Sequence, residues 1–186
     1  MTAKKIEEFN AEDRIDITLL KNSVFFLTGE IDEENIAKCI KWITYENLET
    51  NKDKILTLYV NSVGGDLYQA FALIDIMKTS DYPIRTIGIG TVMSAAFLIV
   101  ASGTKKERYV STNASCMCHQ LTEGGADLKY HDVKAAMKET ELSNEKMLNI
   151  LVEATGKVAS YIKKRLLPPT DVYTVSYTHL TLPTIL

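Results

Sequence analysis

Three features that many protein classes require are scarce in this 186-residue chain: cysteine, excess positive charge and long apolar runs. Its three cysteines do not make the disulfide framework of a small secreted protein. The formal net charge is −3 and no basic stripe is present, so nucleic acid is not an expected partner. The longest fully apolar run, residues 95–101, is too short to span a bilayer, and the first ten residues lack a signal-peptide pattern. We therefore expect a cytoplasmic protein that has no membrane partner.

The rest of the composition is typical of a folded domain. Hydrophobic residues make up 46% of the chain and charged residues 24%, which argues against disorder. Cys116 and Cys118 alternate on one expected strand and would face the same side. A C-x-C pair can bind metal, but no second pair exists. We therefore expect no metal site, and expect reduced thiols packed as small apolar residues.

Strands alternate with helices along the sequence. The apolar patterns predict strands over residues 24–27, 55–60, 84–89, 108–110 and 115–118. They predict helices over about 33–49, 66–79, 95–102, 127–154 and 159–166, and a turn over 61–65. This alternation is typical of βαβ units in a mostly parallel α/β sheet, which places ligands at the carboxyl ends of its strands.

The two ends of the chain differ in character from its middle. Residues 1–20 are polar with few apolar positions, which predicts a flexible arm before one domain over residues 21–174. Residues 175–186 resemble the translation of a transposase-based sequencing adapter, so we expect a non-native tail in which His179 has no role. The alternative for this tail is a short natural strand, because it contains Thr, Tyr and Val.

Ser94 lies where the apolar strand that begins at Ile84 turns into a helix of small residues. A serine at such a tight turn points its hydroxyl outward, and the helix N-terminus behind it favours negative charge. This is the geometry of an acyl-transfer nucleophile, which also needs a base within reach. The alternative is a serine that only caps the helix.

Two further elements would complete such a site. His119 ends an apolar strand, whereas His131 lies on a charged helix face; taken alone, either histidine could be structural. Gly64-Gly65 allows close backbone approach, although a glycine pair can also be an ordinary turn. Acyl transfer needs N–H donors for the developing oxyanion, which Gly65 and Ala95 can provide.

Four segments carry a resemblance to a known family. NSVGG at 61–65, GTVMS at 90–94 and MCHQ at 117–120 resemble the proteolytic subunits of Clp proteases. VFFLTGEI at 24–31 is similar to the opening strand of that family. The resemblance runs from about Arg14 to Tyr173, and the spacings between the glycines, the serine and the histidine agree.

The resemblance implies a ClpP/crotonase-type fold with a long protruding handle helix over 127–154. It implies two stacked heptameric rings, a peptidase chamber inside them, and an AAA+ unfoldase partner that uses ATP to thread polypeptides in. It assigns residues 1–20 to the axial-loop region and 21–174 to the serine protease domain. No cofactor on this chain is implied.

The site residues carry over one by one. Ser94 matches the nucleophile, His119 the general base, and Gly65 and Ala95 the oxyanion-hole positions. Asp171 resembles the acid of the triad, although an apparent two-residue insertion precedes it and it could instead be a cap or loop acid. The chain departs from the family pattern in two places.

Val63 replaces the usual proline before the glycines, which makes that turn less rigid. Ala95 replaces a common methionine but keeps its backbone N–H. We therefore expect a serine endopeptidase that hydrolyses unfolded proteins through an acyl-enzyme. The alternatives are a catalytically silent subunit of a mixed ring, a crotonase-like acyl-CoA enzyme, for which matching glutamates are missing, and a membrane-anchored serine–lysine peptidase.

Overall fold

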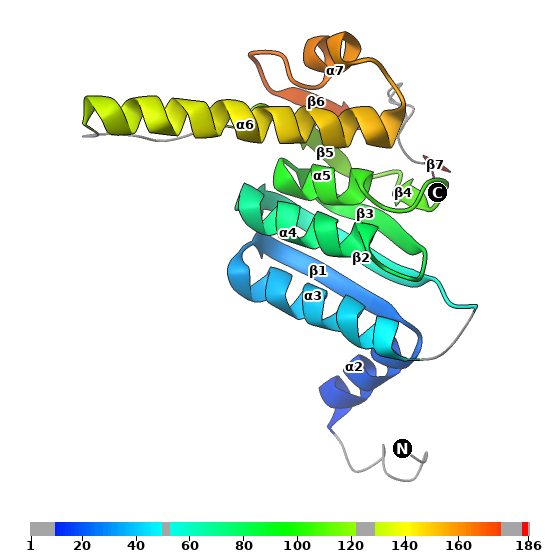
Figure 1. Ribbon diagram of the computed structural model, residues 1–186. Coiled ribbons are helices and arrows are strands. Elements are labelled where there is room, and N and C mark those ends of the chain that lie inside the picture. Colours follow the sequence, from blue (N-terminus) through cyan, green and yellow to red (C-terminus); the bar gives the residue numbers. More distant parts are fainter. Residues whose placement is uncertain (1–9, 50–52, 122–128, 176–183, 186) are drawn as a thin grey trace.

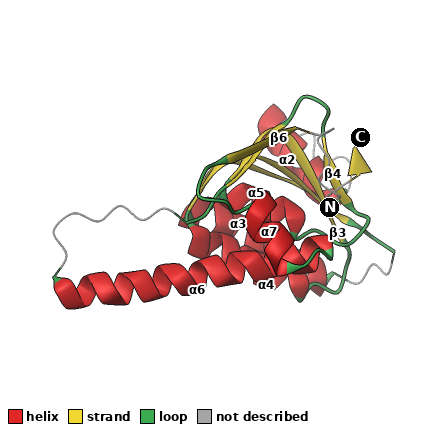
Figure 2. Ribbon diagram, turned by 90° about the horizontal axis from the view of Figure 1, so that it is seen from above, coloured by secondary structure: helices red, strands yellow, loops and turns green. Residues whose placement is uncertain are grey.

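A computed structural model describes residues 10–49, 53–121, 129–175 and 184–185. It shows one twisted sheet with helices packed against one face and one long helix that projects beyond the body (Figures 1 and 2). The helices are α2 (Ala11–Lys21), α3 (Glu33–Leu48), α4 (Leu67–Lys78), α5 (Ala95–Ala101), α6 (Tyr130–Thr155) and α7 (Ala159–Arg165). The strands are β1 (Val24–Ile31), β2 (Leu56–Gly65), β3 (Ile84–Met93), β4 (Arg108–Val110), β5 (Ser115–Cys118), β6 (Val172–Val175) and β7 (Thr184–Ile185).

The sheet has the mostly parallel topology that the alternation of elements predicts. Its path is β1-β2-β3-β4-β7, and β5 also pairs with β3. Strand β3 pairs with β4 through residues 86–88 and with β5 through residues 91–93, both in parallel. Among the strands that the structure describes, only β6 runs antiparallel, beside β5. The predicted α/β fold with a mostly parallel sheet is therefore confirmed.

Alternation along β2 shows how the sheet acquires its buried face. Leu56, Leu58 and Val60 are fully buried, whereas the residues between them are only partly covered. Helix α5 packs against β2 and β3 with all seven residues buried, which explains its purely apolar sequence. The first residue of this buried helix directly follows Ser94, so the core fixes the position of that serine.

Two aspartates are the N-cap residues of helices α3 and α4. Asp32 Oδ1 accepts the N–H of Asn35, and Asp66 Oδ1 accepts those of Tyr68 and Gln69. These three hydrogen bonds satisfy N–H groups that have no partner within the helix. The reciprocal half of a capping box does not form at Asp66, because its own N–H donates to the Ile31 carbonyl of β1.

The boundaries differ from the sequence expectation at two places. Residues 11–20, expected in a flexible arm, form most of α2, which Asn10 caps through the N–H of Asp13. Residues 61–65, expected as a turn, continue strand β2, since β1 and β3 extend beside them. Periodicity did not show the extension of β2, because it depends on pairing with neighbouring strands.

Helix α6 begins at Tyr130, and residues 127–128 of the expected helix lie outside the described residues. Its buried residues all come from the second half of the helix: Ser143, Met147, Leu148 and Leu151. The first half projects away from the body (Figure 2). With 26 residues, α6 is about 39 Å long at about 1.5 Å per residue.

Strands β6 and β7 include parts of the tail that resembles adapter sequence. Val175 lies opposite Ser115 of β5, and Thr184–Ile185 pair with Tyr109 and Val110 of β4. The division into arm, domain and non-native tail remains a prediction, and His179 lies outside the described residues. Within the described ranges, no helix combines the length and apolar character needed to cross a membrane.

Candidate active site

Ser94 lies in a strained turn between β3 and α5. Its φ is 54° and its ψ is −124°, a backbone conformation that residues other than glycine rarely adopt. Such a conformation costs about 1–3 kcal/mol, so surrounding contacts must impose it. The Ser94 N–H donates to the Met117 carbonyl of β5 (2.8 Å), and the Ser94 carbonyl accepts the N–H of Phe97 (3.0 Å). These bonds fix the serine between the strand and the buried helix.

His119 lies within hydrogen-bond distance of this serine. The distance from His119 Nε2 to Ser94 Oγ is 2.7 Å. The cause is topological: Met93 pairs with Met117, so Ser94 and His119 both follow the carboxyl ends of adjacent parallel strands. With the proton on Nδ1, His119 Nε2 accepts the hydroxyl hydrogen, which is the arrangement of a nucleophile and its base.

Gly64 is the residue that packs directly against the turn. A Cβ at Gly64 would lie 2.7 Å from Ser94 Cβ, 2.8 Å from the Met93 carbonyl and 3.3 Å from Ala95 N. Its φ of +102° also disfavours any other residue. From the sequence, the glycine pair was expected to allow close backbone approach, and only Gly65 was given a role, as an oxyanion donor. The pair indicated the close approach, but strand pairing decides which of the two glycines contacts the serine.

The two expected oxyanion donors lie on either side of this contact. Ala95 opens α5, where first-turn N–H groups lack partners within the helix. Gly65 follows Gly64 at the end of β2, with a φ of +146°, and faces Ile31 of β1. The N–H of Gly64 is already engaged, because it donates to Ser62 Oγ at 3.0 Å.

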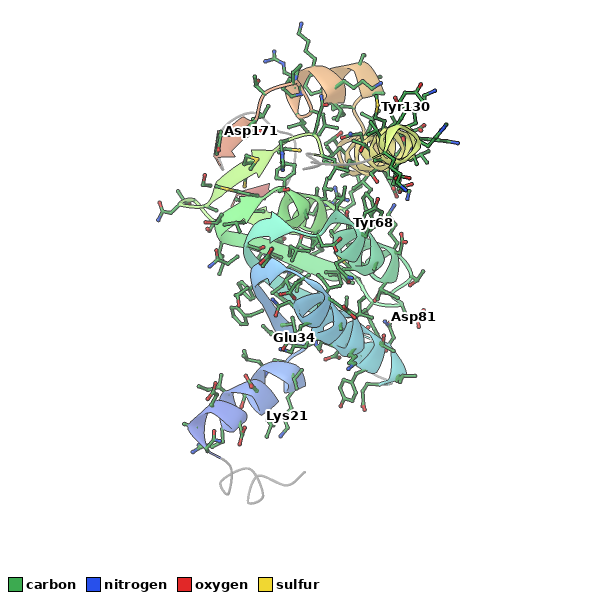
Figure 3. All side chains as sticks on the ribbon, turned by 90° about the vertical axis from the view of Figure 1, so that its left-hand side faces the viewer. Lys21, Glu34, Tyr68, Asp81, Tyr130 and Asp171 are labelled. Carbon is green, nitrogen blue, oxygen red and sulfur yellow. The ribbon has the colours of Figure 1, made fainter. Side chains whose placement is uncertain are left out.

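Asp171 lies near His119 without contacting it through a hydrogen bond. It is exposed and directly precedes β6, as Figure 3 shows. In the antiparallel ladder Cys118 lies opposite Val172, so the next pair along it would be His119 and Asp171. No hydrogen bond or ion pair joins these two described residues. The structure thus brings Ser94 and His119 together and leaves the acid outside hydrogen-bond contact.

Side chains from two other elements hold the segment after His119. Asn144 of α6 accepts the N–H of Leu121 through Oδ1 at 3.0 Å. Gln120 Nε2 donates to the Leu167 carbonyl, beyond α7, at 2.7 Å. A cleft of about 680 Å³ lies beside this segment, and Gln120, Asn144 and Leu167 are among its lining residues. The segment after His119 is therefore attached by hydrogen bonds to α6 and to the residues that follow α7.

The remaining candidates do not compete as catalytic groups. His131 is exposed on α6, with its ring edge-on to Tyr130, as expected for a solvated face. Cys116 and Cys118 are free and buried, which confirms their packing as apolar residues. Burial raises the pKa of Cys116 to about 11 and that of Cys118 to about 12. Both thiols therefore stay protonated at neutral pH and are poor nucleophiles.

Metal ligands do not gather at the site either. Among the residues that the structure describes, no group of three or more His, Cys, Asp or Glu side chains could hold a metal ion. The reactive groups in the site are a hydroxyl, an imidazole and backbone amides.

Comparison with known families gives one match that covers most of the chain. A sequence model of the Clp protease family matches residues 7–170. The matched range includes Ser94, His119, Gly65 and Ala95, and it ends one residue before Asp171. The matched part of the sequence thus includes both residues of the serine–histidine contact and leaves out Asp171.

Proposed function

Since the chain belongs to the Clp protease family and is a peptidase of that type, we propose that it is a serine endopeptidase. In this proposal it is the proteolytic subunit of an ATP-dependent Clp protease and cleaves unfolded proteins into peptides. The observation that carries the proposal is the 2.7 Å contact between His119 Nε2 and Ser94 Oγ at a strained strand–helix turn.

The first half of the reaction forms an acyl-enzyme. Ser94 Oγ attacks the scissile carbonyl carbon while His119 Nε2 accepts its proton. The N–H groups of Gly65 and Ala95 donate hydrogen bonds to the developing oxyanion. His119 then gives the proton to the leaving amine, the C–N bond breaks, and the acyl group remains on Ser94 as an ester.

The second half regenerates the enzyme. His119 removes a proton from water, the resulting nucleophile attacks the ester carbonyl, and the proton returns to Ser94 as the acid product leaves. Asp171 is proposed to orient the imidazole and stabilise its charged form, which requires it to turn toward His119 from its exposed position before β6. Neither half of the reaction uses a cofactor or a metal on this chain.

Assembly and partners belong to the same proposal. The chain forms two stacked heptameric rings that enclose the active sites, and an AAA+ unfoldase in the cytoplasm feeds polypeptides to them with ATP. Extended substrates bind through their main chain, which gives affinity with little sequence choice. The family membership supports this picture, and the long projecting helix α6 offers a surface for contacts between rings.

Replacement of Ser94 by alanine tests the chemistry directly. We expect Ser94→Ala to lower kcat on a fluorogenic peptide by roughly 10⁴–10⁶-fold, because the nucleophile is lost. Ser102→Ala is the matched control, since Ser102 lies at the other end of α5 and its hydroxyl bonds the Leu98 carbonyl. Normal cleavage by Ser94→Ala would show that the assignment is wrong.

A second candidate is a catalytically silent subunit of a mixed Clp ring. The observation that favours it is the position of Asp171, which is exposed and forms no hydrogen bond with His119. Labelling with a fluorophosphonate separates the two candidates, because a silent subunit does not react. Labelling of the wild type that is lost in Ser94→Ala supports the endopeptidase.

A further inference from the structure

We propose that Asn61 is a positioning residue for the nucleophile: its side-chain amide fixes the bulge in β3 that delivers Ser94 to His119. This inference rests on the proposed function. Asn61 lies on β2, is exposed, and does not contact Ser94 or His119 by any hydrogen bond among the described residues. Its effect on the reaction would therefore pass through the backbone of β3.

The bulge is visible in the register of β2 and β3. Val60 pairs with Gly88, but Ser62 pairs with Val92. Three residues of β3 (Ile89, Gly90, Thr91) thus lie opposite Asn61 alone. Such a bulge leaves backbone groups without ladder partners and bends the strand, and bulges are common beside active sites.

The Asn61 side chain supplies the missing partner. Its Oδ1 accepts the N–H of Thr91 at 3.0 Å. Its amide group also contacts Gly90: a Cβ added to Gly90 would lie 2.8 Å from Asn61 Oδ1 and 3.3 Å from Asn61 Cγ. Gly90 has a φ of +57°, so the close approach and the backbone conformation both need glycine there. Asn61 and Gly90 together define the path of the chain through the bulge.

This path determines where the nucleophile emerges. From Thr91 onward β3 pairs regularly with β5, through Thr91 with Ser115, Val92 with Cys116 and Met93 with Met117. Ser94 is the next residue, and its strained backbone donates to the same Met117. A one-residue slip within the bulge would change which side chain reaches the strand–helix turn. Even a displacement of about 1 Å can lower a reaction rate by about 100-fold.

Three variants of the full chain test the inference. Asn61→Ala removes the acceptor, and Asn61→Asp keeps an oxygen at the same position. Asn47→Ala is the control, because Asn47 Oδ1 also accepts a backbone N–H from another element, that of Asp81 at 2.8 Å, far along the chain from the site. The measurements are the rate constant for fluorophosphonate labelling, kcat and KM on a fluorogenic peptide, and the melting temperature.

We expect Asn61→Ala to lower kcat and the labelling rate about 10-fold with KM nearly unchanged, since the nucleophile is misplaced while substrate binding is retained. Asn61→Asp should recover most of the rate, and Asn47→Ala should react like the wild type even where its melting temperature falls. If Asn61→Ala labels and turns over at wild-type rates, or if Asn61→Asp recovers none of the lost rate, the positioning role of Asn61 is wrong, while the proposed function is unaffected. A wild type that fails to label overturns the proposed function, and the positioning role with it.

Discussion

At the scale of single residues, the site depends on one strained serine and one glycine packed against it. Ser94 has a positive φ, and the backbone bonds to Met117 and Phe97 hold it there. Gly64 leaves room for this turn, because any Cβ would collide with Ser94. The strain and the close contact together point the hydroxyl at His119.

Gly64→Ala should therefore abolish most of the reaction. We expect labelling by fluorophosphonate to fall by at least about 100-fold, because the new Cβ displaces Ser94 and crowds the N–H of Ala95. Gly156→Ala is the matched control: Gly156 has a φ of +68° and nothing within 4 Å of an added Cβ. Both variants should lose about 1 kcal/mol or more of stability from the positive φ. Equal labelling of the two would contradict the role given to Gly64.

At the scale of elements, strand β5 connects the whole site. It pairs with β3, which directly precedes Ser94, and with β6, which follows Asp171, and it ends directly before His119. Its two cysteines point into the core, while Ser115 and Met117 are only partly covered. One face of β5 is therefore packed into the core through two buried thiols, and this packing holds His119, which follows the strand.

Because of these thiols, the free energy of unfolding should decrease as the pH rises into the alkaline range. Folding raises the pKa values of Cys116 and Cys118 from 9.0 to about 11 and about 12, because burial disfavours the thiolate. The unfolded chain ionises first, so the contribution is fully present below pH 9 and is lost as pH rises toward 11–12. Each thiol should reduce the free energy of unfolding by at most about 1.4 kcal/mol per pH unit in this window.

Urea unfolding at pH 8 and pH 10, with a reductant present, measures this effect. A Cys116→Ala, Cys118→Ala double variant should lose less stability than the wild type between these two values. An identical pH dependence in both proteins would show that the thiols ionise as readily when folded as when unfolded.

At the scale of the whole molecule, the projecting half of α6 presents apolar side chains that the described residues do not bury. Tyr130, Val133 and Met137 follow one another at helical spacing and are 67%, 39% and 60% exposed. A row of exposed apolar residues is typical of a surface that contacts another protein. The proposed double ring would cover this row with the corresponding helix of the opposite ring.

Met137→Glu should separate the two rings, because a charge buried between apolar helices is unfavourable. Sedimentation velocity should show single rings for Met137→Glu and double rings for the wild type. Ala135→Glu adds the same charge at an exposed position two residues away, on another side of the helix, and should stay a double ring. If Met137→Glu sediments like the wild type, α6 does not join the rings through this row.

Much of the site could be predicted from local sequence. The apolar strand before Ser94, the small-residue helix after it and the histidine that ends β5 all lie within continuous segments. Local patterns also predicted the mostly parallel sheet and the two helices that Asp32 and Asp66 cap. The expected turn at residues 61–65 is part of a strand, and helix α2 was not predicted, since these structures depend on neighbouring strands and on a cap at Asn10.

By itself, then, the sequence pointed to the residues that we propose carry the chemistry, because strand, helix and turn preferences act over a few neighbouring residues. Tertiary structure alone decided that β5 lies beside β3, that Gly64 rather than Gly65 touches Ser94, and that Asp171 lies across from His119 without a hydrogen bond. Those outcomes depend on strand order and register between segments distant in the chain. The free energy of such pairing comes from packing across the sheet, which no local pattern records.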